Sequence, residues 1–143
     1  MEPAQHTIVI AIVTNDKREI LLAKRHEPES AHAHNKWEFV GGGIHYDEDP
    51  TAAVIREAKE EAGIEVEVVR LLPKVFSHLW TFADGRTQQI ILISYECKIA
   101  SGIPTPNLEE NISELKFVPL EEIKNMDTLP QVFEMAEMVF SNH

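Results

Sequence analysis

Three glutamates in the middle of the chain are the residues with the clearest potential for chemistry. Glu57, Glu60 and Glu61 stand at positions i, i+3 and i+4, so on a helix their carboxylates share one face. Like charges at this spacing repel, by roughly a few tenths of a kcal/mol per pair on an open helix. A hard divalent cation such as Mg²⁺ would compensate, because it prefers oxygen ligands and leaves room for substrate phosphates. A solvated acidic face explains the same three residues, and their spacing alone does not separate the two interpretations.

The helix that must carry these glutamates has a start signal and a stop signal. Asp49 followed by Pro50 is typical of a helix start, since aspartate caps the first turn and proline lacks only an N–H that has no helical partner there. Gly63 is typical of the left-handed residue that follows a helix. The sequence therefore predicts a helix from Pro50 to about Ala62.

Apolar runs before this helix predict strands. Thr7–Val13 and Ile20–Ala23 flank a turn-like Asn15–Lys17, and together they predict a buried hairpin. The polar segment 26–36 predicts a loop, and Trp37–Gly43 predicts a short strand that runs into a flexible turn.

Apolar segments after the helix predict the rest of the fold. Further strands are expected at residues 64–69, 74–82, 88–99 and 115–118, with a helical turn or two at 120–124 and an amphipathic helix at 130–140. Strands with a central and a terminal helix predict an α/β fold in which a mixed sheet lies between helices.

Length, charge and cysteine content limit the class of protein. The 143 residues fit one domain, 1–143. A formal charge of -11 argues against a nucleic-acid duplex as partner, although a bound cation allows an acidic protein to bind phosphate. The lone Cys97 lies in an apolar run, so we expect an unreactive residue of the core. A single cysteine also suits a reducing compartment. No apolar stretch approaches the roughly 18 residues of a membrane span, and Met1–Gln5 lacks a secretory layout, so a cytosolic protein without a membrane partner is expected.

The glutamates belong to a longer pattern. It consists of Gly42, five residues, Glu48, seven residues, Arg56-Glu57, Ala58, one residue, Glu60-Glu61, one residue, Gly63 and Ile64. This pattern, residues 42–64, resembles the Nudix box at every specified position, and the expected glycine loop, helix and C-cap are the context that the motif requires. The resemblance implies an α/β/α sandwich across nearly the whole chain. It also implies an enzyme that hydrolyses nucleoside diphosphates linked to another moiety, with Mg²⁺ or Mn²⁺.

The resemblance assigns roles to residues of the box. Glu57, Glu60 and Glu61 match the metal-binding glutamates, and one of them also helps to activate water. Glu48 matches a more peripheral glutamate, and Arg56 matches the arginine that orients the catalytic carboxylates.

Residues outside the box complete the expected metal site. Gly41 falls where the family often offers a backbone carbonyl to metal. A glutamate from a distant loop often joins, and Glu109, Glu110 and Glu114 are the candidates, with Glu110 taken as the additional acid. A solvated loop is the simpler interpretation of those three.

A narrower resemblance concerns the substrate. Residues 31–42, AHAHNKWEFVGG, are similar to the stretch before the box in MutT-type nucleoside triphosphate pyrophosphohydrolases. On that alignment Arg25 matches an arginine used on substrate phosphate, and His32 matches a substrate-loop histidine. The strand that lines the nucleotide pocket is Glu38, Phe39, Val40 and Gly41. The simpler interpretations are a strand-end surface charge for Arg25 and an ordinary loop residue for His32.

Some positions depart from the MutT pattern. Val40 replaces the usual proline, Asp47 replaces a glycine, and residues 129–132 hold no clear counterpart of the asparagine that reads an oxidised purine. Markers of other Nudix subgroups are not matched at residues 79–82, although Trp80 or Phe82 could stack on a base.

These resemblances favour a nucleoside triphosphate substrate that is cleaved to a monophosphate and pyrophosphate. ADP-ribose or nucleotide sugars are the next alternatives, and a non-catalytic Nudix module that senses a nucleotide is an alternative of another class. His34, His45 and His78 lack zinc-like spacing, so no structural zinc is expected. Many relatives dimerise, and the sequence leaves a homodimer open.

Overall fold

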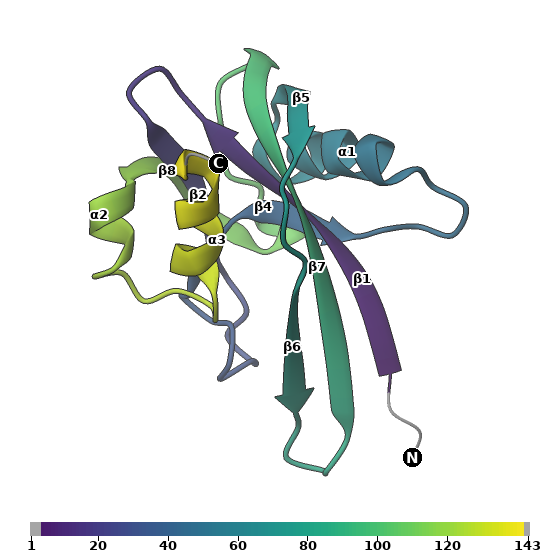
Figure 1. Cartoon of the computed structure of the whole chain (residues 1–143). Helices are drawn as coiled ribbons and strands as arrows, with labels where there is room; N and C mark the ends of the chain where they lie inside the picture. The colour runs from purple at the N-terminus through teal and green to yellow at the C-terminus, as the bar shows by residue number, and fades with distance from the viewer. Residues whose placement is uncertain (1–3, 142–143) are drawn as a thin grey trace.

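A computed structural model describes residues 4–141, and expectations for residues 1–3 and 142–143 lie outside the described residues. The chain forms one eight-stranded mixed sheet with helices packed against it (Figure 1). The strands are β1 (Ala4–Thr14), β2 (Glu19–Arg25), β3 (Trp37–Glu38), β4 (Val40–Gly43), β5 (Glu65–Leu71), β6 (Phe76–Thr81), β7 (Thr87–Ser101) and β8 (Ile112–Pro119). The helices are α1 (Pro50–Ala62), α2 (Leu120–Ile123) and α3 (Val132–Phe140), with a 3-10 turn at Leu108–Glu110.

The long strand β1 organises the sheet. It runs parallel to β7 along its whole length and antiparallel to β4, while β5 and β6 pair with the other edge of β7. The predicted hairpin is wrong beyond its turn, because β1 and β2 share only the Thr14–Ile20 pair before they diverge. From there β2 pairs with β8 and β3. Long-range pairing decides which strand satisfies each backbone edge, and the local run of residues does not encode that choice.

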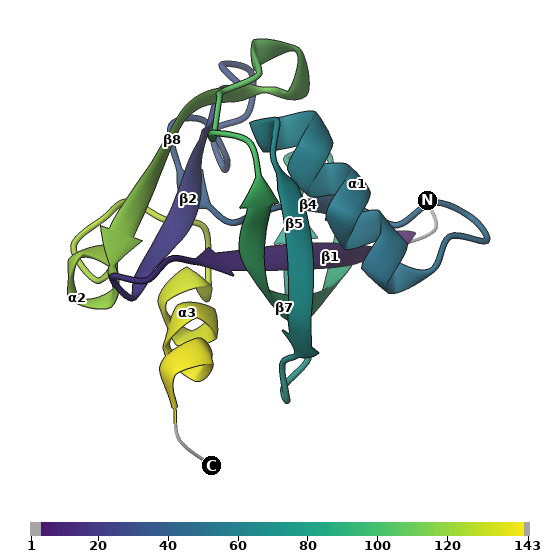
Figure 2. The same cartoon turned by 90° about the horizontal axis from the view of Figure 1, so that it is seen from above.

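Helices cover both faces of the sheet. On β1, Val9, Ala11 and Val13 join the core beneath α1, whereas Ile10 and Ile12 join the core beneath α2 and α3. Figure 2 shows α1 over β5, β1 and β4, and α3 beside β2 on the other side. A strand buried on both faces is continuously apolar, which explains the run in β1. The predicted α/β/α sandwich with a mixed sheet is confirmed.

The glycine-rich segment is a strand, so the predicted flexible turn at its end is wrong. Gly41, Gly42 and Gly43 lie in β4, opposite Ile10, Val9 and Ile8 of β1. A Cβ on Gly42 would lie 2.5 Å from a carboxylate oxygen of Glu57. The absence of side chains lets this strand approach both β1 and α1 closely, which is the physical use of these glycines.

The predicted helix of the box is confirmed at both ends. Asp49 accepts a hydrogen bond from the N–H of Thr51 at 2.9 Å, and Gly63 ends the helix with φ 69°. Elsewhere, Cys97 is fully buried, and burial raises the pKa of its thiol to about 12, as expected of an unreactive core residue. Between residues 4 and 141, the helices are all too short or too polar to cross a membrane.

Candidate active site

Helix α1 turns two of its three glutamates inward against β4. Glu57 and Glu61 are only 8% and 5% exposed, whereas the side chain of Glu60 is 41% exposed. A solvated acidic face therefore describes Glu60 at most. Buried carboxylates need partners, and these come from an arginine, a backbone amide and the edge of β4.

Arg56 connects the acidic residues of the cluster. Its Nε donates to Glu48 at 2.8 Å, and one terminal nitrogen donates to Glu57 at 2.8 Å and to Glu60 at 3.0 Å. The other terminal nitrogen donates to Glu48 at 3.0 Å and to the carbonyl of Gly43 at 3.1 Å. These hydrogen bonds from Arg56, with one from the His45 amide, lower the pKa of Glu48 to about 2. The guanidinium thus fixes the carboxylates relative to one another and to β4.

Glu61 lies deepest in the cluster. It accepts a hydrogen bond from the N–H of Gly41 at 2.9 Å. Burial raises the pKa of Glu61 to about 9, and the nearby charges of Glu38 and Glu57 oppose its ionisation further. Burial likewise raises the pKa of Glu57, with smaller contributions from Glu60 and Glu110. A cation at this place would relieve the unfavourable burial of negative charge.

The hydrogen bond to Glu61 also fixes the direction of the Gly41 backbone. The N–H and C=O of a residue in a strand point to the same edge. Since the Gly41 N–H faces Glu61 and the Gly43 carbonyl faces Arg56, the Gly41 carbonyl lies on the edge of β4 that faces α1. This edge adds backbone oxygens to the carboxylates of α1.

The donor set suits a hard divalent cation, since carboxylate and carbonyl oxygens are the ligands that Mg²⁺ and Mn²⁺ take. Within the described part of the chain, no three acidic, histidine or cysteine side chains converge closely enough to form a complete metal site. Arg56 and the Gly41 amide donate hydrogen bonds to carboxylate oxygens of Glu57 and Glu61. The residues fit the group in the kind of donor atom that they offer.

Of the three distant glutamates, Glu110 is the one whose charge reaches the cluster. It lies in the 3-10 turn after Asn107, and its charge is among those that raise the pKa of Glu57. Glu114 lies on β8 opposite Lys24. Of the three candidates, Glu110 is therefore the one retained as the additional acid of the proposed site.

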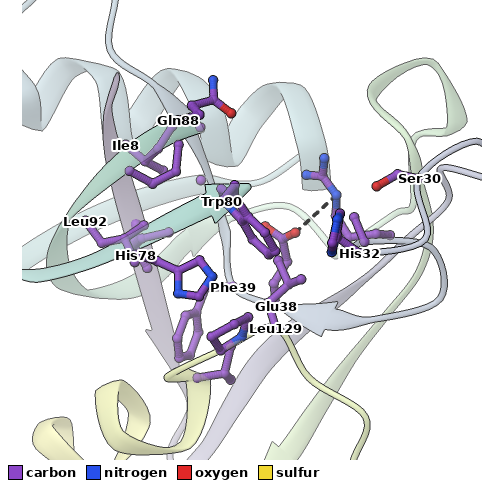
Figure 3. Close-up of a pocket in the computed structure, with 18 of the residues that line it drawn as sticks. Ile8, Ser30, His32, Glu38, Phe39, His78, Trp80, Gln88, Leu92 and Leu129 are labelled. Carbon is purple, nitrogen blue, oxygen red and sulfur yellow. Dashed lines mark ion pairs between the residues drawn. The ribbon is translucent and has the colours of Figure 1, made fainter. Parts of the chain in front are cut away.

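A cavity of about 320 Å³ lies on the other side of β4 (Figure 3). Arg25, His32, Glu38, Phe39 and Gly41, all predicted to bind substrate, line it. The remaining walls are largely apolar and come from β1, β6 and the residue after it, β7, and α3 with the segment before it: Ile8, Ile10, Trp80, Phe82, Ile90, Leu92, Leu129, Val132 and Met135.

Val40 is the exception among the predicted pocket residues. Its side chain packs in the core beneath α1 and does not line the cavity. The alternation of side chains along a strand is the cause, since Val40 points away from the face that its neighbours Phe39 and Gly41 present.

Arg25 and Glu38 form one polar wall of the cavity. Arg25 pairs with Glu27 and, through its Nε at 3.1 Å, with Glu38. Burial raises the pKa of Glu38 to about 7, although Arg25 opposes this shift. An Arg25 held by two carboxylates inside a cavity is neither a surface charge nor a free cation.

Aromatic rings form a further part of the cavity lining. Trp80 lies 5.3 Å from the ring of His32 and 4.4 Å from that of His78, and Figure 3 shows these rings beside Glu38 and Phe39. His78 and Gln88 line the cavity as well, although sequence reasoning assigned neither of them to the site. The period-2 pattern of β6 contained the missing signal for His78, because this residue shares the face of Trp80.

Comparison with known proteins identifies a family and several similar proteins. The NUDIX domain family matches residues 4–139. Nucleoside triphosphatase NudI of Enterobacter sp. (strain 638) is 30% identical over 128 residues, which cover 86% of this chain and 88% of that protein. The 8-oxo-dGTP diphosphatase of Escherichia coli (strain K12) is 40% identical over 68 residues, about half of each chain at 48% and 51%. The crystal structure of the MutT protein from Methanosarcina mazei Go1 superposes with a TM-score of 0.76, at 25% identity and 99% coverage of both chains.

Fold, acidic helix and adjoining cavity together define a hydrolase of phosphoanhydride-containing compounds. The chain belongs to the Nudix hydrolase family, because the match to the family covers nearly every described residue.

Proposed function

We propose that this protein hydrolyses nucleoside triphosphates to a nucleoside monophosphate and pyrophosphate, with Mg²⁺ or Mn²⁺ held by Glu57, Glu60, Glu61 and the Gly41 carbonyl. The observation that carries the proposal is the position of β4. Gly41 and Gly42 line the cavity, while Glu61 bonds to Gly41 and Glu57 lies against Gly42. A nucleotide could therefore place its base in the cavity and its phosphates over α1, with the part between them passing over Gly41 and Gly42.

The residues of the site divide the work. When bound, the metal neutralises the diphosphate oxygens and lowers the pKa of a water molecule. Arg56 and Glu48 keep the carboxylates in place through the five hydrogen bonds of the guanidinium. One of the three box glutamates, or Glu110, accepts the proton of the attacking water.

The cavity would hold the base. Trp80 and His32 offer rings for stacking, which is worth roughly 1–3 kcal/mol per base. Among the described residues, Glu38 Oε2 is buried without a well-aligned hydrogen-bond donor, although it lies 3.1 Å from Arg25 Nε. The N–H groups of a base would supply such donors. With Arg25 already paired to two glutamates, phosphate is expected over α1 more than in the cavity.

Two observations favour this function over the alternatives. The cavity, at about 320 Å³, lies at the small end of the ~300–1,000 Å³ range of ligand pockets, which suits one nucleoside better than the two sugar-bearing parts of ADP-ribose or a nucleotide sugar. A non-catalytic sensor is disfavoured because all the box glutamates are present. The similarity to the nucleoside triphosphatase NudI over most of both chains supports the same choice.

The test is a panel of nucleoside triphosphates, nucleotide sugars and ADP-ribose with Mg²⁺ or Mn²⁺, with products separated by chromatography. Pyrophosphate release from a triphosphate supports the proposal. Two monophosphate products from a sugar-linked compound, with the triphosphates untouched, contradict it. A cytosolic location, the absence of a duplex nucleic-acid partner and a homodimer stay predictions from the sequence.

A further inference from the structure

The loop of residues 102–111 is fastened to the C-terminal end of α1. The Nδ2 of Asn107 donates to the carbonyl of Glu60 at 2.9 Å, and the N–H of Thr105 donates to the carbonyl of Ala62 at 2.9 Å. The last carbonyls of a helix have no partner within the helix, so such bonds satisfy groups that would otherwise need water. The loop is therefore bound to the same turn of α1 that carries Glu60 and Glu61.

Asn107 also organises the turn that follows it. Its Oδ1 accepts a hydrogen bond from the N–H of Glu109 at 3.1 Å. Its backbone carbonyl accepts from the N–H of Glu110 at 3.0 Å and from that of Ile112 at 3.1 Å. Asparagine is suited to this place because one side chain both donates and accepts, whereas aspartate only accepts.

The turn that carries Glu110 is held at both of its ends. Asn107 holds the turn on one side, and the fully buried Ile112, the first residue of β8, holds it on the other. The charge of Glu110 reaches Glu57, where it adds to the effect of burial on the Glu57 pKa. The backbone of the turn that carries Glu110 is thus anchored to the C-terminal end of α1.

We propose that Asn107 is a positioning residue for hydrolysis, which joins the 3-10 turn that carries Glu110 to the turn of α1 that carries Glu60 and Glu61. This inference rests on the proposed function. Asn107 itself touches only backbone groups of α1 and of the turn, so its effect on the reaction passes through Glu110.

A double-mutant cycle tests this dependence. Asn107→Asp keeps one oxygen that accepts from the Glu109 amide. Its second oxygen replaces the Nδ2 donor and faces the Glu60 carbonyl, so the hydrogen bond to α1 is lost. We expect kcat to fall by about 10-fold or more, the usual effect of removing an outer partner of a metal site, with KM for the nucleotide little changed. In a Glu110→Gln background, Asn107→Asp should lower kcat no further. Thr105→Ser is the matched control, because Thr105 joins α1 through its backbone N–H and serine retains the hydroxyl that donates to the Ile103 carbonyl, so its kcat should equal that of the wild type.

Equal losses of kcat in the wild-type and Glu110→Gln backgrounds would overturn the inference, as would wild-type activity of Glu110→Gln alone. If Asn107→Asp fails to fold in thermal melts, Asn107→Ser replaces it, since serine retains a capping oxygen but is too short to reach Glu60. If the wild type cleaves no compound of the panel, the proposed function fails, and Mn²⁺ binding followed by electron paramagnetic resonance tests Asn107 instead. Asn107→Asp and Glu110→Gln should then each weaken Mn²⁺ binding, and their effects should not add in the double variant. Unchanged Mn²⁺ binding in both single variants would overturn the positioning role.

Discussion

Replacing Glu61 by glutamine should stabilise the metal-free protein, and increasingly so as pH rises. Glutamine retains an oxygen for the Gly41 N–H but cannot ionise. Burial raises the pKa of Glu61 from its ordinary 4.5 to about 9. Between these values the folded state binds a proton that the unfolded chain has released, so stability falls as pH rises through this window. At about 1.36 kcal/mol per pH unit, the penalty approaches about 3 kcal/mol at pH 7.

Thermal melts in EDTA from pH 5 to pH 8 measure this effect. The Tm of Glu61→Gln minus that of the wild type should grow by roughly 10 °C over this range, since about 1 kcal/mol moves Tm by a few degrees in a domain of this size. Titrations common to both proteins cancel in the difference. Glu67→Gln is the control for the loss of one negative charge, because Glu67 is an exposed residue of β5 outside the cluster, and its Tm difference should change much less over the same range.

A flat Tm difference for Glu61→Gln between pH 5 and pH 8 would refute the reasoning, because it would mean that Glu61 ionises freely in the folded protein. Added Mg²⁺ should reverse the order by stabilising the wild type more than the variant, since a ligand stabilises in proportion to its affinity for the folded state. The variant should also lose most of its hydrolytic activity. Higher stability joined to lower activity is the signature of a residue retained for function.

The glycine strand, the cavity wall and the guanidinium each give a further prediction. Gly41→Ala should lower Tm by more than about 10 °C, because its Cβ would overlap the carbonyl oxygen of the opposing strand, whereas Gly43→Ala, with nothing within 4 Å of its Cβ, should melt as the wild type does. Trp80→Ala should raise KM for the nucleotide by roughly 10-fold with kcat little changed, while Leu79→Ala, exposed and outside the cavity, should leave both constants unchanged in steady-state assays. Arg56→Lys should lower kcat by roughly 100-fold, since an ammonium has only three N–H donors and cannot make the five hydrogen bonds of the guanidinium, and circular dichroism should show an intact fold. Wild-type activity of the lysine variant would contradict the role given to the guanidinium.

Sequence reasoning succeeded where the structure depends on near neighbours in the chain. The helix from Pro50 to about Ala62 was predicted correctly at both ends, because an aspartate cap, a proline in the first turn and a terminal glycine act over three or four positions. The family resemblance came from the same short segment. The glutamate spacing, the inert cysteine and the fold class were also within reach of the sequence.

Tertiary structure alone decided how these pieces meet. Glu57, Glu60 and Glu61 share one helical face in the sequence, yet only packing against β4 buries two of them and leaves the third exposed. The partners of β1 and β2, the direction of Val40, and the place of His78 in the cavity all depend on strand pairings between residues far apart in the chain. The bond from Asn107 to the Glu60 carbonyl spans 47 positions. Such contacts depend on which of several possible packings of the whole chain is most stable. A local run of residues therefore determines the elements of the site but not how they assemble.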